Sequence, residues 1–481
     1  MSLKQKTVAG LFWTFSQQFS RQIISFGVSV ILARLLSPSE FGLIGMLSIF
    51  IAVGSTLMDS GMTSSIIRDS NSDQRDYSTV FIINIISSLF IYAIVCLIAP
   101  YIADFYGYPI LTDIIRVYSF CFVLSAFMGV QAAKLTKEMN FKVQMVIQLP
   151  SIILSGILGI FLAYNGYGVW SLVYMNVFQT FLLSVQHWYY SGWRPDLKFD
   201  YERFKYHFNF GYKITLSNLL GTLYQNIFTI LIAKYFSAAQ VGFYNRALAI
   251  RQLPISNLST ALGKVTYPML SSINNDDVKL KNVYKRLIQQ VVFWIVPILI
   301  LLIVIAEPFF RFLLTEKWLP AVPYFQILCV TGMLLPIQAY NYNIIKVKGR
   351  TDITLKLQVV KKVFGIVGIM LVIPFGIMGM LYFQLLSAIV DYNLDAHYGG
   401  KMINYSITEQ IKDILPSISL AVIVGILTWM LDSFINKSYS IPDLSRIIIG
   451  GLFYFSFYLS VSYLIQLAAV KDFKKLILKR S

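Results

Sequence analysis

The sequence predicts an all-α, polytopic membrane protein with about 14 transmembrane helices. Of the 481 residues 57% are hydrophobic and only 13% are charged, and the mean hydropathy is +0.66. A soluble domain is roughly 45–50% apolar and about 25% charged, so these values exclude a soluble globular protein. The apolar residues also recur in blocks of about 18 to 25 residues, the length that carries an α-helix across ~30 Å of hydrocarbon.

Each helix is placed on one apolar block, with polar or turn-forming residues at its ends. The first block carries Arg21 at its centre, and no small-residue cleavage pattern follows it, which indicates a retained helix and not a signal peptide. Val291–Ala306 is almost wholly apolar, whereas the eighth block contains two arginines and a lysine. The predicted helices are 11–34, 41–61, 78–101, 112–133, 143–164, 168–189, 212–236, 241–268, 287–306, 321–345, 355–374, 376–397, 411–433 and 444–468.

The distribution of Lys and Arg predicts the orientation of these helices. With the N-terminus in the cytoplasm, 27 of the 40 basic residues fall in cytoplasmic segments, 5 fall on the opposite side and 8 lie within helices. In this count the residues at helix ends, Arg34, Lys213, Lys234, Lys356 and Lys412, belong to the adjoining loops. Cytoplasmic loops of membrane proteins are enriched in Lys and Arg, so we expect both termini in the cytoplasm. The net charge of +17 then reflects topology and attraction to anionic lipid, and it does not indicate a nucleic-acid partner.

An internal repeat predicts the domain organisation. Residues 32–43 read LARLLSPSEFGL and residues 232–243 read IAKYFSAAQVGF, at the first turn of each half. The pairs Ala33/Ala233, Ser37/Ser237 and Gly42/Gly242 are identical. We therefore expect two parallel-repeat, six-helix lobes, 1–200 and 201–405, followed by two additional transmembrane helices and a basic cytoplasmic tail, 406–481. The polar stretch Ser191–Lys213 is interpreted as the cytoplasmic linker between the lobes.

Seven motifs along the whole chain resemble one known family: LARLLSPSEFG (32–42), KEMNFK (137–142), YGVWSLV (167–173), GWRPDLKF (192–199), GFYNRAL (242–248), VTYPMLS (265–271) and KGRTDITLKL (348–357). They look like the polysaccharide exporter branch of the multidrug/oligosaccharidyl-lipid/polysaccharide (MOP) superfamily, which includes the Wzx-type flippases. The resemblance implies two lobes around a central cavity. It also implies flipping of an undecaprenyl-diphosphate-linked oligosaccharide, a unit of O-antigen, capsule or exopolysaccharide, to the outer leaflet by alternating access. The bacterial cytoplasmic (inner) membrane is the expected location, and the expected partners are the lipid bilayer and other polysaccharide assembly proteins.

The first helix carries a polar stripe that suits the wall of a water-filled cavity. Its side chains share an arc of about 80°, and an ionisable group at mid-bilayer requires a partner, water or a function. The guanidinium of Arg21 could bind a diphosphate bidentately. Alternatively, Arg21 forms a structural pair with Asp59 on the next helix, and both interpretations stay open. The stripe consists of Thr14, Gln18, Arg21, Ser25 and Ser29.

The eighth helix carries a second basic face. Arg246, Asn257 and Lys264 share an arc of about 60° with Thr260, while Arg251 lies about 140° from Arg246 on a straight helix. The alternative is that Arg246 extends to the outer interface. The family resemblance, in which cavity arginines on the first, second and eighth helices are implicated in diphosphate binding, favours Arg21 and Arg246, followed by Arg251.

Helices 355–374 and 376–397 form a hairpin that brings acidic and basic residues to one depth. Asp391 and Asp395 lie one turn apart, and Lys361 lies at nearly the same depth on the preceding helix. Two carboxylates in a membrane suit a coupling site for Na⁺ or H⁺. We favour the alternative, a Lys–Asp structural pair. His187, His207 and His397 lack metal-ligand spacing and are interpreted as interfacial residues.

The motifs that are absent favour a transporter over an enzyme. No phosphate-binding G-x-x-x-x-G-K-[ST] loop occurs in the sequence, nor does an H-E-x-x-H or G-x-S-x-G motif. We expect no resident cofactor or metal. Two other functions stay open: a cation-coupled multidrug exporter of the same superfamily, whose cavity should be acidic, and a membrane enzyme of polysaccharide assembly.

Overall fold

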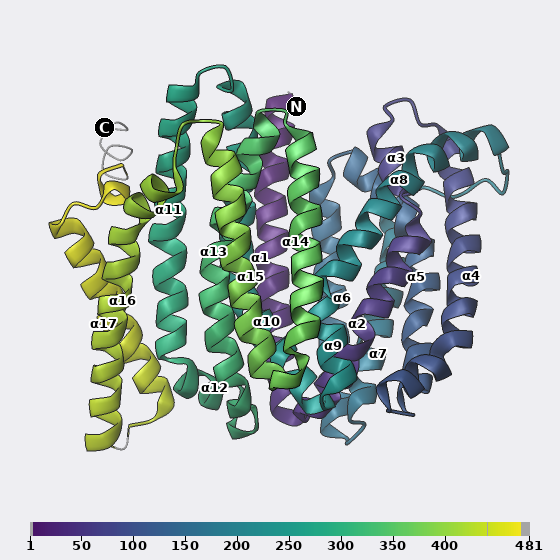
Figure 1. Ribbon diagram of the computed structural model, residues 1–481. Coiled ribbons are helices and arrows are strands. Elements are labelled where there is room, and N and C mark those ends of the chain that lie inside the picture. Colours follow the sequence, from purple (N-terminus) through teal and green to yellow (C-terminus); the bar gives the residue numbers. More distant parts are fainter. Residues whose placement is uncertain (1–2, 440, 473–481) are drawn as a thin grey trace. The chain divides into compact units, whose positions relative to one another are not determined.

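The computed structural model describes residues 3–439 and 441–472, and it describes their side chains except at residues 3–12, 257–265, 267 and 268. All regular secondary structure in this part is helical (Figure 1), which confirms the predicted all-α fold class. Packing divides the chain into unit 1, Met1–Gly242, and unit 2, Phe243–Ser481.

Unit 1 contains α1 (Leu3–Leu35), α2 (Pro38–Asp59), α3 (Met62–Arg68), α4 (Gln74–Tyr106), α5 (Leu111–Lys137), α6 (Phe141–Tyr164), α7 (Val169–Tyr190), α8 (Tyr201–Gln225), α9 (Ile227–Tyr235) and the start of α10 (Ala238–Ser272). Unit 2 contains the rest of α10, α11 (Asp277–Val304), α12 (Ala306–Leu314), η1 (Glu316–Ala321), α13 (Val322–Val347), α14 (Thr351–Val372), η2 (Ile373–Phe375), α15 (Gly376–Lys401), α16 (Ile407–Ser438) and α17 (Asp443–Leu464).

Each unit is a bundle of long helices that pack on their neighbours. In unit 1, α4 packs on α5, α5 on α7, α7 on α6 and α6 on α1, while α8 crosses α2, α3 and α4. In unit 2, α13 packs on α15 and α11, α11 packs on α16, and α16 packs on α17. The packing therefore groups α8 and α9 with unit 1, whereas the repeat places them in the predicted second lobe. Packing and sequence repeat are different criteria, so the lobe boundaries stay a prediction.

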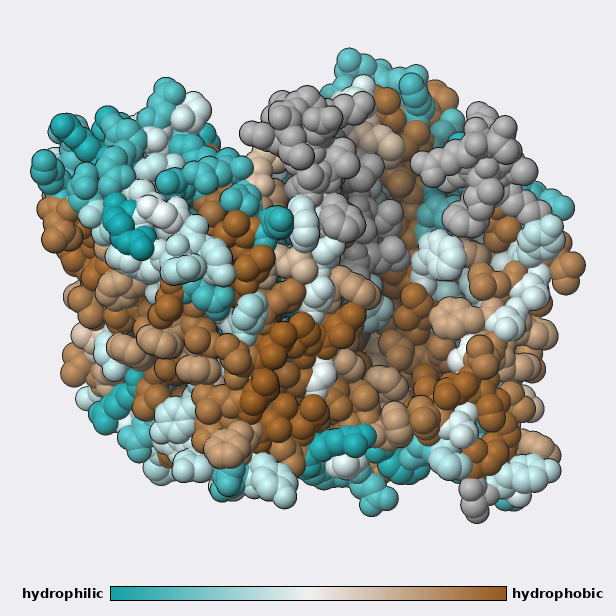
Figure 2. Space-filling view, turned by 180° about the vertical axis from the view of Figure 1, so that it is seen from behind, coloured by the Kyte–Doolittle hydropathy of each residue, from teal (hydrophilic) through white to brown (hydrophobic). Residues whose placement is uncertain are grey.

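The length and apolarity of the helices identify a multi-pass membrane protein. Within the described residues, nine segments are long and apolar enough to cross a membrane, or ten if the bent pair α8–α9 counts as one span. This criterion does not establish the predicted count of 14. Hydrophobic residues cover the middle of the helices and hydrophilic residues gather toward their ends (Figure 2). Large apolar side chains such as Leu97, which is 73% exposed, and Leu371, which is 70% exposed, lie on these helices, as a hydrocarbon solvent permits.

The two turns of the internal repeat have the same capping geometry. Ser37 caps α2: its Oγ accepts from the Glu40 backbone N–H at 3.4 Å, and the Glu40 carboxylate accepts from the Ser37 N–H at 2.6 Å. Ser237 and Gln240 form the same reciprocal pair at the start of α10, at 3.4 and 3.1 Å. Both are capping boxes, which satisfy backbone N–H groups that the first helical turn leaves without partners.

The equivalent turns also contact each other within unit 1. A Cβ atom added to Gly42 would lie 1.7 Å from the carbonyl oxygen of Ala238, and one added to Gly242 would lie 2.0 Å from the carbonyl oxygen of Pro38. Only glycine permits such a close approach of two backbones. This one backbone contact therefore explains why both repeats have glycine at the equivalent position, Gly42 and Gly242.

The predicted linker and seventh helix require correction. The prediction of a linker over Ser191–Lys213 is wrong, because α8 begins at Tyr201 and only residues 191–200 lie between helices. The Asp200 carboxylate caps α8 by accepting from the backbone N–H groups of Glu202 and Arg203 at 3.0 and 3.2 Å. The predicted helix 212–236 is two helices that meet at Asn226 with a bend of 46°.

Candidate functional site

The polar stripe of the first helix lies on α1, whose packed face is turned to α6. Gln17 donates to Gln148 on α6 at 2.7 Å, and Val28 lies against Gly156 of α6. On the stripe, Gln18 is half-buried, while Arg21 and Ser25 are exposed. Within the described residues, no hydrogen bond or ion pair engages the Arg21 side chain. Arg21 therefore presents an available guanidinium on α1, the first of the predicted membrane helices.

The structure does not bring Arg21 and Asp59 together. The half-buried Asp59 carboxylate accepts a hydrogen bond from the Thr63 hydroxyl of α3, and no ion pair joins it to Arg21 in the described part of the chain. The reason lies in the packing of their helices. α1 packs on α6, whereas α2, which follows the turn at Pro38, packs on α4, α5 and α8.

Arg246 and Arg251 are both buried in unit 2. The Arg246 guanidinium lies 5.4 Å from the centroid of the Trp318 ring in η1, a favourable cation–π arrangement. Arg251 donates to the Leu328 carbonyl oxygen of α13 and to Gln252 Oε1, both at 3.5 Å, and its Nε is buried without a hydrogen-bond partner in the described residues. The side chains of Asn257 and Lys264 lie outside the described residues.

The predicted acidic and basic groups of the α14–α15 hairpin do meet. Lys361 of α14 forms an ion pair with Asp395 of α15, and the two residues are 7% and 2% exposed. Asp391 lies one turn away, and its buried Oδ1 has no hydrogen-bond partner among the described residues. The Lys361 ammonium and the carboxylates of Asp391 and Asp395 therefore form one charged cluster in unit 2.

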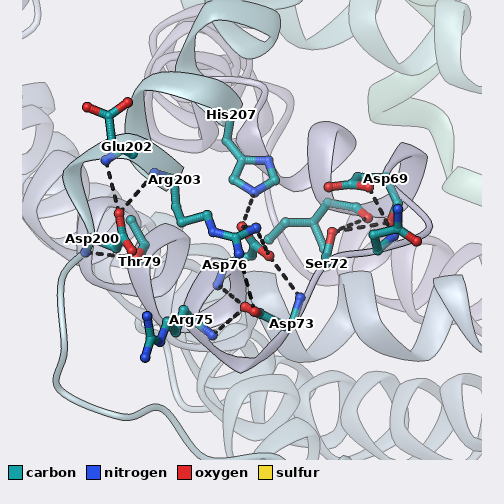
Figure 3. A network of polar contacts seen from close by, with 12 residues as sticks. Asp69, Ser72, Asp73, Arg75, Asp76, Thr79, Asp200, Glu202, Arg203 and His207 are labelled. Atoms are coloured by element: carbon teal, nitrogen blue, oxygen red, sulfur yellow. Dashed lines mark hydrogen bonds and ion pairs between the residues drawn. The ribbon is translucent and has the colours of Figure 1, made fainter.

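A polar network at the start of α8 was not anticipated (Figure 3). His207 is fully buried in this network: one ring nitrogen lies 3.1 Å from Asp76 Oδ1 and the other lies 2.8 Å from Ser65 Oγ. Arg203 donates to both oxygens of Asp76, at 3.2 and 3.1 Å, and to Asp73 at 3.4 Å. A buried carboxylate requires such partners.

The same network fixes the start of α4 and the segment 191–200, the linker between α7 and α8. Asp73 caps α4, and hydrogen bonds from the backbone N–H groups of Asp76 and Arg75, together with the Arg203 charge, lower the pKa of Asp73. The linker follows the first turn of α4, because the Asp196 N–H donates to Ser78 Oγ at 2.9 Å and the Trp193 indole donates to Gln74 at 2.6 Å. The capping pattern Asp73-x-x-Asp76 was the available sequence signal for this arrangement.

Comparison with known proteins places the chain in a family. The family described as "Polysaccharide biosynthesis protein" matches residues 31–323, more than half of the chain. The chain belongs to this family. The resemblance inferred from the motifs is thereby confirmed.

Several individual proteins are similar to this chain. The lipopolysaccharide biosynthesis protein WzxC of Escherichia coli (strain K12) is 26% identical over 82% of the chain and 81% of its own length. The teichuronic acid biosynthesis protein TuaB of Bacillus subtilis (strain 168) is 24% identical over 73% of each. An uncharacterized membrane protein in the cps region of Klebsiella pneumoniae is 25% identical over the full length of both chains.

Solved structures share its fold. The lipid II flippase MurJ, in an inward closed conformation, aligns with a TM-score of 0.74 at 14% identity, over 95% of this chain and 99% of that one. An inward-facing multidrug resistance transporter of the MATE family aligns with a TM-score of 0.63 at 16% identity, over 80% and 96%. The chain is thus a multi-pass membrane protein that shares the fold of these two transporters.

Proposed function

We propose that this protein flips an undecaprenyl-diphosphate-linked oligosaccharide from the cytoplasmic to the outer leaflet by alternating access. It resides in the bacterial cytoplasmic membrane with both termini in the cytoplasm, and it acts with other proteins of polysaccharide assembly. The family match and the named relatives support a role in polysaccharide biosynthesis. The anionic nature of the substrate is inferred from the side chains, and its lipid-linked nature from the family resemblance.

The observation that carries the proposal is the exposed guanidinium of Arg21. It lies on the polar stripe of α1, a predicted membrane helix, and no described residue engages it. An uncompensated charge in a membrane segment is costly and usually marks a substrate or ion pathway. A diphosphate offers several oxygen acceptors, and guanidinium groups bind phosphate oxygens bidentately. In this role Gln18 and Ser25 contribute neutral hydrogen bonds from the same stripe.

The arginines of unit 2 support an anionic substrate. Arg251 is buried with two long hydrogen bonds and, within the described residues, without a carboxylate partner. Together with Arg246 it makes this part of α10 basic. A multidrug exporter of cations would instead require acidic groups, so the basic side chains favour an anion over the drug-export alternative.

The proposal is tested by finding the leaflet that holds the substrate. In cells that lack this protein, complete lipid-linked oligosaccharide should accumulate on the cytoplasmic face, because synthesis proceeds and translocation fails. Truncated units, or complete units stranded on the outer face, would support an enzyme of assembly and contradict the proposal.

The first prediction concerns Arg21. Arg21→Ala, at unchanged protein level, should reduce export by about tenfold to a hundredfold, since a hydrogen bond to a charged group contributes ~1.5–3 kcal/mol. Arg116→Ala is the matched control, because Arg116 is also an exposed arginine of unit 1. Export is measured as surface polysaccharide in complemented cells. Equal export by the two variants would remove Arg21 from the substrate site.

We further propose that any coupling ion, Na⁺ or H⁺, binds at Asp391 and Asp395 beside Lys361. The unpartnered Asp391 oxygen supports ion coupling. The buried Lys361–Asp395 pair supports the structural alternative. Variants that separate these two roles are described below.

A further inference from the structure

Unit 1 has an apolar groove that the proposed transport does not use. The groove has a volume of about 590 Å³ and lies between α2, α4 and the α8–α9 bend. Leu223, just before the bend, and Ile230, just after it, both line the groove, opposite Val53 of α2 and Ile98 of α4. Leu223 is 41% exposed and Ile98 is 40% exposed, so the groove is open to the surroundings of the protein.

The surroundings of this groove are lipid. Its walls belong to α2, α4 and the bent pair α8–α9, all of which are candidate membrane spans. Along α4 the aliphatic lining runs from Ile91 to Ile102, which is about 16 Å at 1.5 Å per residue. Half of a ~30 Å hydrocarbon core is about 15 Å. The groove therefore has the depth of one leaflet, which suits an acyl chain better than a much longer polyprenyl chain.

Two polar side chains, Tyr106 and Lys234, lie at one end of the groove, whose lining is mostly apolar. Tyr106 lines it and is only 6% exposed, yet its hydroxyl has no hydrogen-bond partner among the described residues. A buried hydroxyl without a partner is unfavourable, so an acceptor in the groove would stabilise it. Beside it, Lys234 donates to the Phe105 carbonyl oxygen at 2.6 Å and lies 4.2 Å from the centroid of the Phe105 ring. An ammonium has three N–H donors, so Lys234 can also bind a phosphate.

We propose that this groove binds one acyl chain of a glycerophospholipid. The order of groups along the groove matches the order in the lipid: hydrocarbon against Ile91–Ile102, the ester carbonyl at the Tyr106 hydroxyl, and the phosphate beside Lys234. Because Leu223 and Ile230 flank the bend, the bound chain also packs against both arms of α8–α9. This site does not depend on the proposed transport.

The test counts the lipids bound to the purified full-length protein. Delipidated protein in dodecyl maltoside is titrated with palmitoyl-oleoyl-phosphatidylglycerol, and native mass spectrometry measures the occupancy of the tightest site. Ile98→Trp fills the groove and should lower the affinity at least about tenfold. Leu97→Trp adds the same indole on the neighbouring position, outside the groove lining, and should leave the affinity unchanged.

Two conservative variants test the polar end. Tyr106→Phe keeps the ring and should weaken phosphatidylglycerol binding roughly fivefold, the effect of one neutral hydrogen bond. The wild type should prefer phosphatidylglycerol to the diacylglycerol that lacks the phosphate, and Lys234→Met should abolish this preference. Because Tyr106→Phe preserves packing, it remains informative if Ile98→Trp fails to fold.

Three results would overturn the assignment. Wild-type-like affinity in both Ile98→Trp and Tyr106→Phe would show that lipid binds elsewhere. The absence of any tight one-to-one lipid complex would remove the site. Displacement of phosphatidylglycerol by an equal concentration of undecaprenyl phosphate would assign the groove to a polyprenyl chain.

Discussion

At the residue scale, Lys361 and Asp395 provide the sharpest distinction between a structural and a coupling role. Lys361→Met leaves the Asp395 carboxylate buried without its partner, which should destabilise the protein by ~3–5 kcal/mol. The double variant Lys361→Met/Asp395→Leu removes both charges and should restore most of that loss. The unfolding midpoint in detergent and polysaccharide export in complemented cells are measured for each variant.

The structural alternative predicts that the double variant recovers stability and export together. Recovery of stability with loss of export would contradict it and assign ion coupling to the pair. Asp391→Asn serves as the comparison, because Asp391 lies beside the pair and its Oδ1 has no hydrogen-bond partner within the described residues. A pH- or Na⁺-dependent export defect in Asp391→Asn alone would place the coupling site at Asp391.

At the element scale, the contact between the starts of α2 and α10 should tolerate no added atom. Gly42→Ala places a methyl group 1.7 Å from the Ala238 carbonyl oxygen, so the helices must separate, at a cost of roughly 1–3 kcal/mol or more. In Gly27→Ala the new methyl group meets no atom within 4 Å, and helix propensity should stabilise the protein by up to ~1 kcal/mol. In thermal unfolding in detergent, the unfolding midpoint should therefore fall in Gly42→Ala and rise in Gly27→Ala, relative to the wild type. Equal unfolding midpoints would mean that α2 and α10 accommodate the added methyl group without loss of stability.

The elements also show what a linear pattern can and cannot reveal. Apolar block length located most helices within a few residues, because a membrane span requires ~20 apolar residues. It missed the bend at Asn226, and it missed α3, which follows a turn set by local backbone geometry: Ser60 and Gly61 have positive φ values of 48° and 67°. Likewise, Arg21 and Asp59 were candidates for a pair only because their helices are consecutive in sequence. Tertiary packing separates those helices, and no pattern along the chain encodes that choice.

At the scale of the whole molecule, the distribution of basic residues predicts which loops face the cytoplasm. In a variant without its three native cysteines, Ser70→Cys and Ser438→Cys place single thiols at exposed positions. A membrane-impermeant maleimide added to intact spheroplasts should label Ser438→Cys, and it should label Ser70→Cys only after lysis. The reverse labelling pattern would invert the topology and, with it, the direction of the proposed transport.

The folded molecule also bears on how its gene could be divided into two separately expressed fragments. A cut near residue 200 follows the sequence repeat and looks natural on the printed chain. It would nevertheless leave Asp76 in one fragment and both Arg203 and His207 in the other, although both residues contact the buried Asp76 carboxylate. The first fragment would then lose the side chains that pair with this carboxylate, and its companion would lose the surface on which α8 rests. Co-expressed halves should therefore reassemble better when the break lies after Tyr235, where the chain has already completed the packing of α8 and α9.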